Sequence, residues 1–411
     1  MPCQDLEILR APAEARPAVL EGGWLGGEGG GLAAIDPCSV LERSGEALAE
    51  LPLWLRLHGR QFPRGAAVGF LTYELARWFE KLPLTPDPAL PDFSFAYYPR
   101  LEIIPASTST YRDGGKPPHG EFVTGFDRER FHAGVSRIRE YVAAGDIYQA
   151  NLTQQCRIRL NGTPPEAIYQ RLSPGQAPFR GFLKHPRCAI VSASPERFFR
   201  VHSGRILASP IKGTIRRGEE PQLDKQRAAA LLASEKDRAE NLMIVDLLRN
   251  DLGRICLYDS IRANLWQIET LPQLLHLVSH VEGRLRPGTG ALEILRALFP
   301  CGSITGAPKI RAMEILSEIE AAPRGVSMGA IGIIRGAPED AGFEMDFNVA
   351  IRTMTIQNDV ATFNVGGGIV YDSEPQAEFE EMLLKARPLL DALGLETRGA
   401  RPVPERVTLR R

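Results

Sequence analysis

Apolar and polar residues alternate along the chain in two rhythms, and each rhythm predicts secondary structure. Phe131, Val135 and Ile138 recur at helical spacing, and Gly145 follows where a left-handed glycine often ends a helix. Residues 147–160 then predict a strand. These patterns are clearest in the middle and C-terminal parts of the chain, which are therefore expected to form the main core.

Short strand-like segments follow one another closely, and this spacing shapes the fold prediction. Residues 189–201 form two apolar runs separated by Pro195, and residues 361–365 form another run just before the glycines 366–368. Strands so close in sequence favour antiparallel sheets flanked by helices over a doubly wound parallel sheet. The chain is therefore predicted to have an α+β fold.

Two long helices are expected to begin at recognisable capping residues. In the helix predicted over 234–252, Ser234 is followed three residues later by Asp237, which is a capping-box-like pair. In the last helix, Ser373 is followed by Gln376, and an intervening proline lies in the first turn, where its missing N–H does little harm.

The first 120 residues differ from the rest of the chain. They hold a glycine-rich stretch and several proline-punctuated loops, with short strand-like pieces such as 67–71 between them. We expect residues 1–120 to form an N-terminal region that packs on a catalytic region, residues 121–395. The tail, 396–411, is rich in Arg and Pro and is expected to be loose.

Composition excludes several classes of protein. The formal net charge is −1, which argues against a nucleic-acid footprint. No run of about 18 apolar residues predicts a membrane span, and the N-terminus does not resemble a secretory signal. The six cysteines are scattered without metal-ligand spacing. Together these features favour a cytoplasmic protein with reduced thiols.

Two pairs of carboxylates have the spacing that puts both members on one helix face. Asp237 and Glu240 form one pair, and Glu378 and Glu381 form the other, with Lys385 one turn further on. Either pair alone is most often solvated surface. Together, on two helices, they could supply the few protein oxygens that an octahedral Mg²⁺ takes.

Other residues have a chemical interpretation beside a structural one. Lys212 lies next to a glycine and is ordinarily exposed, but burial would favour the nucleophilic free amine. His276 lies in an apolar stretch, where a histidine more often serves the core. Arg352 offers a planar fork of donors for a carboxylate, or for a surface ion pair. The glycines 366–368 fit either a simple turn or a backbone that approaches an anion.

Several long motifs lie in a fixed order between residues 127 and 390. They are 145–151 (GDIYQAN), 194–198 (SPERF), 209–214 (SPIKGT), 239–251, 302–309 (GSITGAPK), 346–353 and 366–385. In these motifs the chain resembles the chorismate-utilising enzymes, which aminate, hydrate or rearrange chorismate. The first 120 residues match this family only weakly.

The resemblance implies a fold, a metal and roles for particular residues. The fold implied is a sandwich of two antiparallel sheets with helices outside and the active site between them. Mg²⁺ would bind the ring carboxylate of chorismate, and Arg352 with the glycine N–H groups would bind the enolpyruvyl carboxylate. The catalytic residues implied are Glu196 as general acid, Lys212 as nucleophile and His276 beneath the ring. The substrate-binding residues implied are Gln149, Gly213, Thr214, Ser303, Arg352, Gly366, Gly367, Gly368 and Lys385. The metal ligands implied are Glu240, Glu381, Glu378 and Asp237.

Three positions bear on which reaction the chain catalyses. Family members that add water to chorismate carry a lysine where this chain has Gln149, so water addition is disfavoured. Anthranilate-forming members usually carry alanine at the position of Lys212, and Ser303 replaces a threonine. The resemblance therefore predicts amination at C4 to 4-amino-4-deoxychorismate, for 4-aminobenzoate and folate synthesis. Anthranilate formation and a catalytically silent docking subunit remain as alternatives.

The resemblance also implies a partner and raises a question of regulation. The chain has no glutaminase nucleophile motif, so a separate glutamine amidotransferase subunit is expected to supply ammonia. Relatives bind an aromatic amino acid beside a Pro-Phe dipeptide, present here as Pro178 and Phe179. The N-terminal side of that pocket matches poorly, so strong tryptophan inhibition is not expected. Ile333 replaces a tyrosine that often binds the enolpyruvyl carboxylate, which leaves that group to Arg352 and the glycines.

Overall fold

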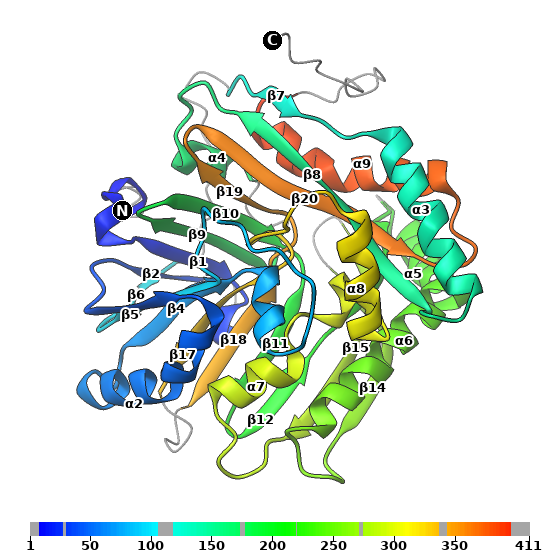
Figure 1. Cartoon of the computed structure of the whole chain (residues 1–411). Helices are drawn as coiled ribbons and strands as arrows, with labels where there is room; N and C mark the ends of the chain where they lie inside the picture. Colours follow the sequence, from blue (N-terminus) through cyan, green and yellow to red (C-terminus); the bar gives the residue numbers. More distant parts are fainter. Residues whose placement is uncertain are drawn as a thin grey trace.

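Two large antiparallel sheets form the framework of the chain (Figure 1). The computed structural model describes residues 8–27, 30–105, 118–172, 177–218, 220–270, 274–336 and 343–395, and the structural statements below concern these ranges. The first sheet runs in the order β16 (Gly306–Ala307), β8 (Gln149–Arg159), β20 (Val360–Ile369), β19 (Thr353–Gln357), β10 (Cys188–Ser194), β9 (Phe179–His185), β1 (Ala18–Gly22), β2 (Gly31–Ala34) and β6 (Glu102–Ile104), with β7 (Glu121–Thr124) also on β8. The second runs in the order β13 (Ile211–Arg216), β15 (Leu274–Arg284), β12 (Arg205–Ala208), β11 (Arg197–His202), β18 (Glu344–Val349), β17 (Ala330–Arg335), β4 (Ala66–Leu71), β5 (Phe93–Tyr98) and β3 (Ser39–Arg43), with β14 (Arg262–Thr270) also on β15.

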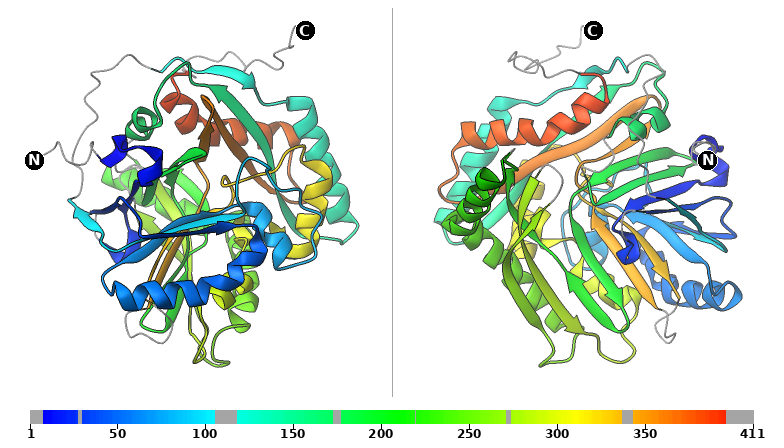
Figure 2. Two further views of the ribbon diagram at one scale, coloured as in Figure 1. Left: turned by 60° about the vertical axis from the view of Figure 1, so that its left-hand side comes forward. Right: turned by 180° about the vertical axis from the view of Figure 1, so that it is seen from behind.

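Helices cover the outer faces of both sheets (Figure 2). The α-helices are α2 (Leu51–Gln61), α3 (Arg128–Ala143), α4 (Pro165–Arg171), α5 (Pro221–Ala233), α6 (Glu235–Gly253), α7 (Ala291–Leu298), α8 (Lys309–Ile319) and α9 (Pro375–Ala392). The short 3-10 turns are η1 (Ala13–Ala15), η2 (Trp24–Gly26), η3 (Gly45–Glu50), η4 (Tyr73–Trp78) and η5 (Gly302–Ile304). Within the described ranges, no helix combines the length and the apolar character needed to cross a membrane.

Buried apolar side chains fill three layers. Phe131 and Phe363 belong to the layer between the first sheet and helices α3, α8 and α9. Leu248 belongs to the layer between the second sheet and helices α2, α6 and α7. Ile190 of the first sheet and Val68 of the second belong to a third cluster between the two sheets. The predicted sandwich of antiparallel sheets with flanking helices is therefore confirmed.

Strands from the first 105 residues extend both sheets. Strands β1, β2 and β6 continue the first sheet beyond β9, and β4, β5 and β3 continue the second beyond β17. The predicted boundary near residue 120 therefore lies between strands that share sheets. The predicted loose tail, 396–411, lies outside the described residues.

The predicted helices α3 and α6 form where the apolar spacing places them. In α3, Phe131, Val135 and Ile138 are almost fully buried, and Gly145 just beyond the end has a φ of 81°. In α6, the Ser234 hydroxyl accepts a hydrogen bond from the backbone N–H of Asp237. Both local predictions are thus confirmed.

At two places the structure departs from the local expectation. Of the two interpretations of Gly366–Gly368, the simple turn is excluded, because these glycines lie within β20, paired with β8. The last helix begins after Glu374 without a side-chain cap. The Ser373 hydroxyl instead donates to Glu378 Oε1 at 2.7 Å, and Gln376 donates to Glu380.

Two of the places where the chain crosses between the sheets are neighbours. Strand β10 ends in the first sheet at Ser194, and β11 begins in the second at Arg197. Pro195 lies between them, and it has no N–H with which to continue a ladder. The predicted strand pair 189–201 is therefore two strands of different sheets. The second crossing runs the other way, from the end of β18 at Val349 to the start of β19 at Thr353.

A buried arginine connects the N-terminal strands to the catalytic region. Arg324 donates to Glu320 Oε1 at 2.7 Å, to the Ile304 carbonyl at 2.7 Å and to the Asn151 carbonyl at 2.6 Å. The backbone N–H groups of residues 324 and 325 in turn donate to Glu74. Burial raises the pKa of Glu74 to about 7. One side chain thus holds η5, β8 and η4 together.

We predict that Arg324→Met destabilises the protein by roughly 3–5 kcal/mol, because it leaves the buried Glu320 carboxylate without its cation. Urea unfolding monitored by tryptophan fluorescence measures this change. Arg137→Met is the matched control, since Arg137 and its partner Glu140 are both exposed, and its unfolding midpoint should match that of the wild type. Equal unfolding midpoints for the two variants would show that the buried Arg324–Glu320 pair does not stabilise the fold.

Candidate active site

The first crossing holds Glu196 in the gap between the sheets. The Ser194 hydroxyl accepts from the Glu196 N–H at 3.2 Å and donates to the Val349 carbonyl at 2.6 Å. The Val349 N–H donates back to the Glu196 carbonyl at 3.0 Å. These bonds fix the backbone on both sides of a side chain that is only 5% exposed.

The surroundings of Glu196 favour the protonated acid. Burial raises the pKa of Glu196 to about 7, against the opposing effects of a hydrogen bond from Ser303, the charge of Lys212 and the Ile211 N–H. One carboxyl oxygen, Oε1, is buried without a hydrogen-bond partner. A carboxyl group that is half protonated near neutral pH can donate a proton to a leaving group.

The second crossing carries Arg352. Its backbone has a φ of 48°, and its carbonyl accepts from Ala193 at 3.0 Å, which joins it to β10. Burial lowers the pKa of the guanidinium, and no described acidic side chain offsets that effect. A buried cation without an anionic partner is costly unless a ligand supplies the anion. Arg352 is therefore placed to bind an anionic substrate.

His276 lies on β15, directly opposite Thr214 of β13. The His276 Nδ1 and the Thr214 hydroxyl are hydrogen-bonded at 2.8 Å, and Nε2 is buried without a partner. Burial, and then the charge of Arg352, lowers the pKa of His276 to about 4. The imidazole is thus neutral at neutral pH, with one ring nitrogen free for substrate.

A bulge aims Lys212 into the site. The register of β13 against β15 shifts between Ile211 and Thr214, and Gly213 within this bulge has a φ of 83°. Bulges redirect side chains and are common beside active sites. The Lys212 side chain is 14% exposed, and its Nζ lies 3.7 Å from Glu240 Oε2.

Gly368 and Gln149 lie against this amine. A Cβ at Gly368 would lie 2.5 Å from Gln149 Nε2 and 3.5 Å from Lys212 Nζ, so only glycine fits there. Both amide atoms of Gln149 are buried without a hydrogen-bond partner among the described residues. The amide is therefore available to a ligand beside the lysine.

Ser303 approaches Glu196 from η5. The Ser303 hydroxyl lies 3.3 Å from the Cys301 sulfur, and its hydrogen bond to Glu196 favours the ionised carboxylate. Burial, together with the charge of Glu196, raises the pKa of the Cys301 thiol to about 12. Cys301 is thus a neutral thiol that contacts the hydroxyl next to the candidate acid.

The predicted metal ligands lie on α6 and α9. Glu240 is near two lysines, with its oxygens 3.7 Å from Lys212 Nζ and 4.0 Å from Lys236 Nζ. Burial opposes the ionisation of Glu381, but the charges of Lys385, Lys236 and Lys212 hold its pKa below the usual value. Because Glu240 and Glu381 share two lysines, their carboxylates face the same region.

The remaining predicted metal and substrate residues surround this region. Burial and the neighbouring Glu381 carboxylate raise the pKa of Glu378, against the Ser373 hydrogen bond. Lys385 Nζ lies 2.8 Å from Glu381 Oε1 and donates to the Gly366 carbonyl at 3.2 Å.

Two glycines allow the charged side chains of α6 and α9 to lie close to the backbone of strands β13 and β20. A Cβ at Gly367 would lie 3.3 Å from Lys385 Nζ. A Cβ at Gly213 would lie 2.9 Å from the Asp237 carboxyl carbon, so Asp237 packs against the bulge. The described residues hold no group of three or more closely spaced metal-ligating side chains.

The Pro-Phe dipeptide contacts a tryptophan of the chain itself. The Trp24 ring meets the Phe179 ring edge-on at 5.4 Å between centroids, and the Arg197 guanidinium lies 4.8 Å from the Phe179 centroid. The Pro178 carbonyl accepts from the Gly23 N–H at 2.7 Å. Ile333 belongs to the same buried cluster as Phe179.

Sequence reasoning missed Cys301 and Arg324, which support the site from outside it. Arg324 bonds to residues of other elements, and Cys301 contacts Ser303 two residues away, but no sequence pattern indicated that either one supports the site. For Arg324, the spacing to Glu320 could have indicated an i, i+4 ion pair, but not its burial.

A buried acid, a lysine and an unpaired arginine between two sheets define an enzyme site for an anion, and known proteins identify the family. A family model described as chorismate binding enzyme matches residues 39–391. Aminodeoxychorismate synthase component 1 of Escherichia coli (strain K12) is 36% identical over 383 residues, covering 87% of this chain and 83% of that protein. Anthranilate synthase component 1 of Methanothermobacter thermautotrophicus is 35% identical over 363 residues, covering 82% and 75%.

A solved structure agrees with these sequence relatives. Anthranilate synthase component I from Streptococcus pneumoniae TIGR4 superposes with a TM-score of 0.74 at 28% identity, covering 88% of this chain and 92% of that one. The chain belongs to the chorismate binding enzymes and acts on chorismate.

We predict that turnover of chorismate falls as the pH rises through about 7, because Glu196 with that pKa is a proton donor only below it. Ser303→Ala removes a hydrogen bond that lowers the pKa of Glu196. The falling limb should therefore move to higher pH, by roughly one unit or less. The measurement is kcat/KM for chorismate against pH at a fixed concentration of free ammonia. A limb that stays in place in Ser303→Ala would show that Glu196 is not the titrating group.

Proposed function

We propose that the chain is the aminating subunit of a 4-amino-4-deoxychorismate synthase. The observation that carries this proposal is Lys212, an amine aimed by a bulge toward the gap that holds Glu196. The sequence relatives named aminodeoxychorismate synthase component 1 support it. The reaction belongs to 4-aminobenzoate and folate synthesis in the cytoplasm.

The first displacement uses the acid and the lysine. The C4 hydroxyl of chorismate leaves as water after it takes the proton of Glu196. The Lys212 amine forms a bond to C2 as both ring double bonds shift by one position and the C4–O bond breaks. Arg352 holds a substrate carboxylate during this step, since no described side chain neutralises it. The neutral His276 presents Nε2 to the ring without adding a charge.

The second displacement uses ammonia. Its nitrogen forms a bond to C4, both double bonds shift back, and the C2–N bond to Lys212 breaks. Lys212 is released as a free amine, and Glu196 recovers a proton from the ammonium group formed at C4. Two displacements leave the new nitrogen at C4, whereas direct attack of ammonia on C2 leads to anthranilate. A separate glutamine amidotransferase subunit supplies the ammonia.

Mg²⁺ is the cofactor of this proposal. Glu240 and Glu381 fit it, because their carboxylates come from two helices and share the same lysines. Glu378 and Asp237 support these ligands from the same helices. When bound, the ion supplies positive charge for the ring carboxylate of chorismate and completes its coordination with water.

We expect wild-type protein with chorismate, Mg²⁺ and ammonium to form 4-amino-4-deoxychorismate, identified by mass. Lys212→Ala should lose this product by at least about a hundredfold, because nucleophilic catalysis ends, or divert turnover to an anthranilate-type product that is detected by fluorescence. Lys225→Ala is the matched control, since Lys225 is an exposed lysine of α5. Anthranilate from the wild type would mean that Lys212 is not the nucleophile.

Replacing the carboxylates should test the metal. Glu240→Gln and Glu381→Gln each keep the shape of the side chain and remove a charge, so the Mg²⁺ concentration for half-maximal activity should rise by roughly tenfold or more. Isothermal titration with Mg²⁺ in the presence of chorismate provides a readout that does not depend on turnover. Asp246→Asn, on the exposed face of α6, is the control. Unchanged Mg²⁺ dependence in both Gln variants would exclude these ligands.

A further inference from the structure

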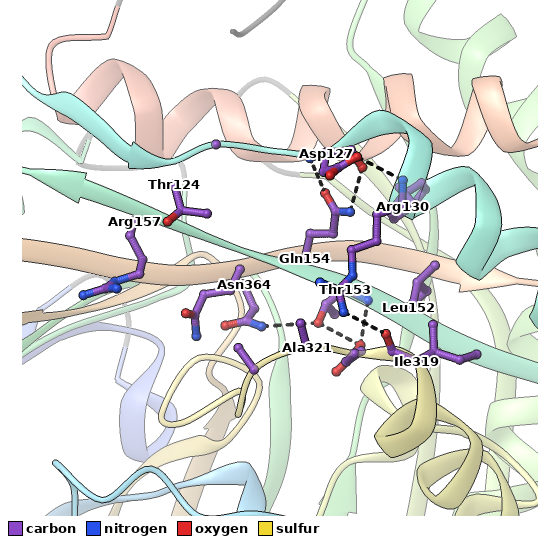
Figure 3. A pocket seen from close by; sticks show the side chains of 15 residues that line it. Thr124, Asp127, Arg130, Leu152, Thr153, Gln154, Arg157, Ile319, Ala321 and Asn364 are labelled. Atoms are coloured by element: carbon purple, nitrogen blue, oxygen red, sulfur yellow. Dashed lines mark hydrogen bonds between the residues drawn. The ribbon is translucent and has the colours of Figure 1, made fainter. Parts of the chain in front are cut away.

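A second pocket lies along the same two strands as the active site. It has a volume of about 300 Å³, and Thr153, Gln154 and Asn364 line it together with the end of α8 (Figure 3). It opens where the edge of β8 has no neighbouring strand among the described residues, between the short pairings with β16 and with β7. Nothing in the active site already described uses it.

The floor of this pocket has one hydrogen-bond acceptor without a donor. Thr153 N–H and its hydroxyl donate to Glu320 Oε1 at 2.8 and 2.9 Å. Because the Thr153 hydroxyl hydrogen is used there, its oxygen can only accept, and it accepts from Asn364 Nδ2 at 3.3 Å. This chain of bonds fixes the amide orientation of Asn364. Its Oδ1 is left buried without a partner, in a side chain that is 3% exposed.

The missing partner must be a small donor of N–H or O–H groups, and the charges favour a neutral one. The Glu320 carboxylate is already neutralised by Arg324 at 2.7 Å, so no free carboxylate remains there to trap a cation. Arg130 and Arg157 lie at opposite ends of the pocket as Figure 3 shows it, and their two positive charges outnumber the single carboxylate of Asp127, which also lines it, so the lining disfavours ammonium. Water and free ammonia both meet these conditions, and of the two only ammonia is the nucleophile of the proposed reaction.

A row of buried polar side chains connects the pocket with the active site. Alternate residues of β8 share one face of the sheet, so Thr153, Asn151 and Gln149 follow one another toward the active site. All three are at most 7% exposed. The row ends at Gln149, whose unpartnered amide contacts Gly368 close to Lys212.

We propose that this pocket is the ammonia inlet of the enzyme, with Asn364 Oδ1 as its first acceptor and the row from Thr153 to Gln149 as the route to C4. The inference rests on the proposed amination. The pocket mouth is then the place where ammonia made by a partner subunit enters.

The test separates the KM for ammonia from the KM for chorismate. Asn364→Leu removes the acceptor, and Ala322→Phe fills space at the pocket wall. Each should raise the KM for free ammonia roughly three- to tenfold, while the KM for chorismate stays within about twofold. The KM expressed as free ammonia should be the same at two pH values. Ala143→Phe, on an exposed turn of α3 outside the pocket, is the control and should change neither constant.

Each outcome decides a separate question. An unchanged KM for ammonia in both variants, or a parallel change in both substrate constants, would overturn the inlet. If Asn364→Leu does not fold, Ala322→Phe decides alone. A wild-type enzyme that forms no aminated product would instead refute the proposed function, and the inlet with it.

Discussion

The site depends on one constraint of the backbone: two of the passages between the sheets, from β10 to β11 and from β18 to β19, lie at neighbouring strands and run in opposite directions. Strands β10 and β19 are paired in the first sheet, and β11 and β18 are paired in the second. Residues 194–197 and 349–353 must therefore cross the gap side by side. Hydrogen bonds between the two crossings, from Ser194 to Val349 and back to Glu196, make them a single unit.

This double crossing explains the electrostatics of the site. A residue at a crossing faces neither a helix layer nor solvent, so its charge is desolvated without a ready partner. For Glu196 this favours the acid, and for Arg352 it leaves a cation that only a ligand can satisfy. Burial and the charge of the same arginine lower the pKa of His276, so its imidazole is neutral. The fold thus arranges one proton donor, one anion receptor and one uncharged imidazole without any of them neutralising another.

The parts of this architecture that sequence could predict are those decided within a few residues. The periodicity of α3 and the capping serine of α6 depend on local geometry, and both were predicted correctly. The sequence left the glycines of β20 open between a turn and an anion-binding backbone, because their partner, β8, lies about two hundred residues away in the chain. Ser373 does not cap α9, although its competitor Glu378 is only five residues away, because the pattern does not show which of two nearby groups takes the hydroxyl.

The same division applies to the site. Residue types and motif order identified the charged groups, but neither could show that Lys212 and Glu240 approach each other, or that Asn364 keeps an unpartnered oxygen. Those facts depend on pairings between distant segments. The break at Pro195 was visible in the sequence, whereas the change of sheet that follows it was not, because a proline ends a ladder without specifying where the next strand pairs.

The position of Lys212 has an evolutionary consequence. Glu196 and Arg352 lie where the two sheets interlock, so replacing either disturbs the framework that both sheets share. Lys212 lies on β13, which continues the pairing of β12 along β15, inside a bulge that already departs from regular pairing. A lineage can exchange that residue without disturbing a crossing that both sheets share. On the proposed mechanism such an exchange changes the position at which nitrogen enters the ring, so divergence between amination products within one ancestral scaffold requires few substitutions.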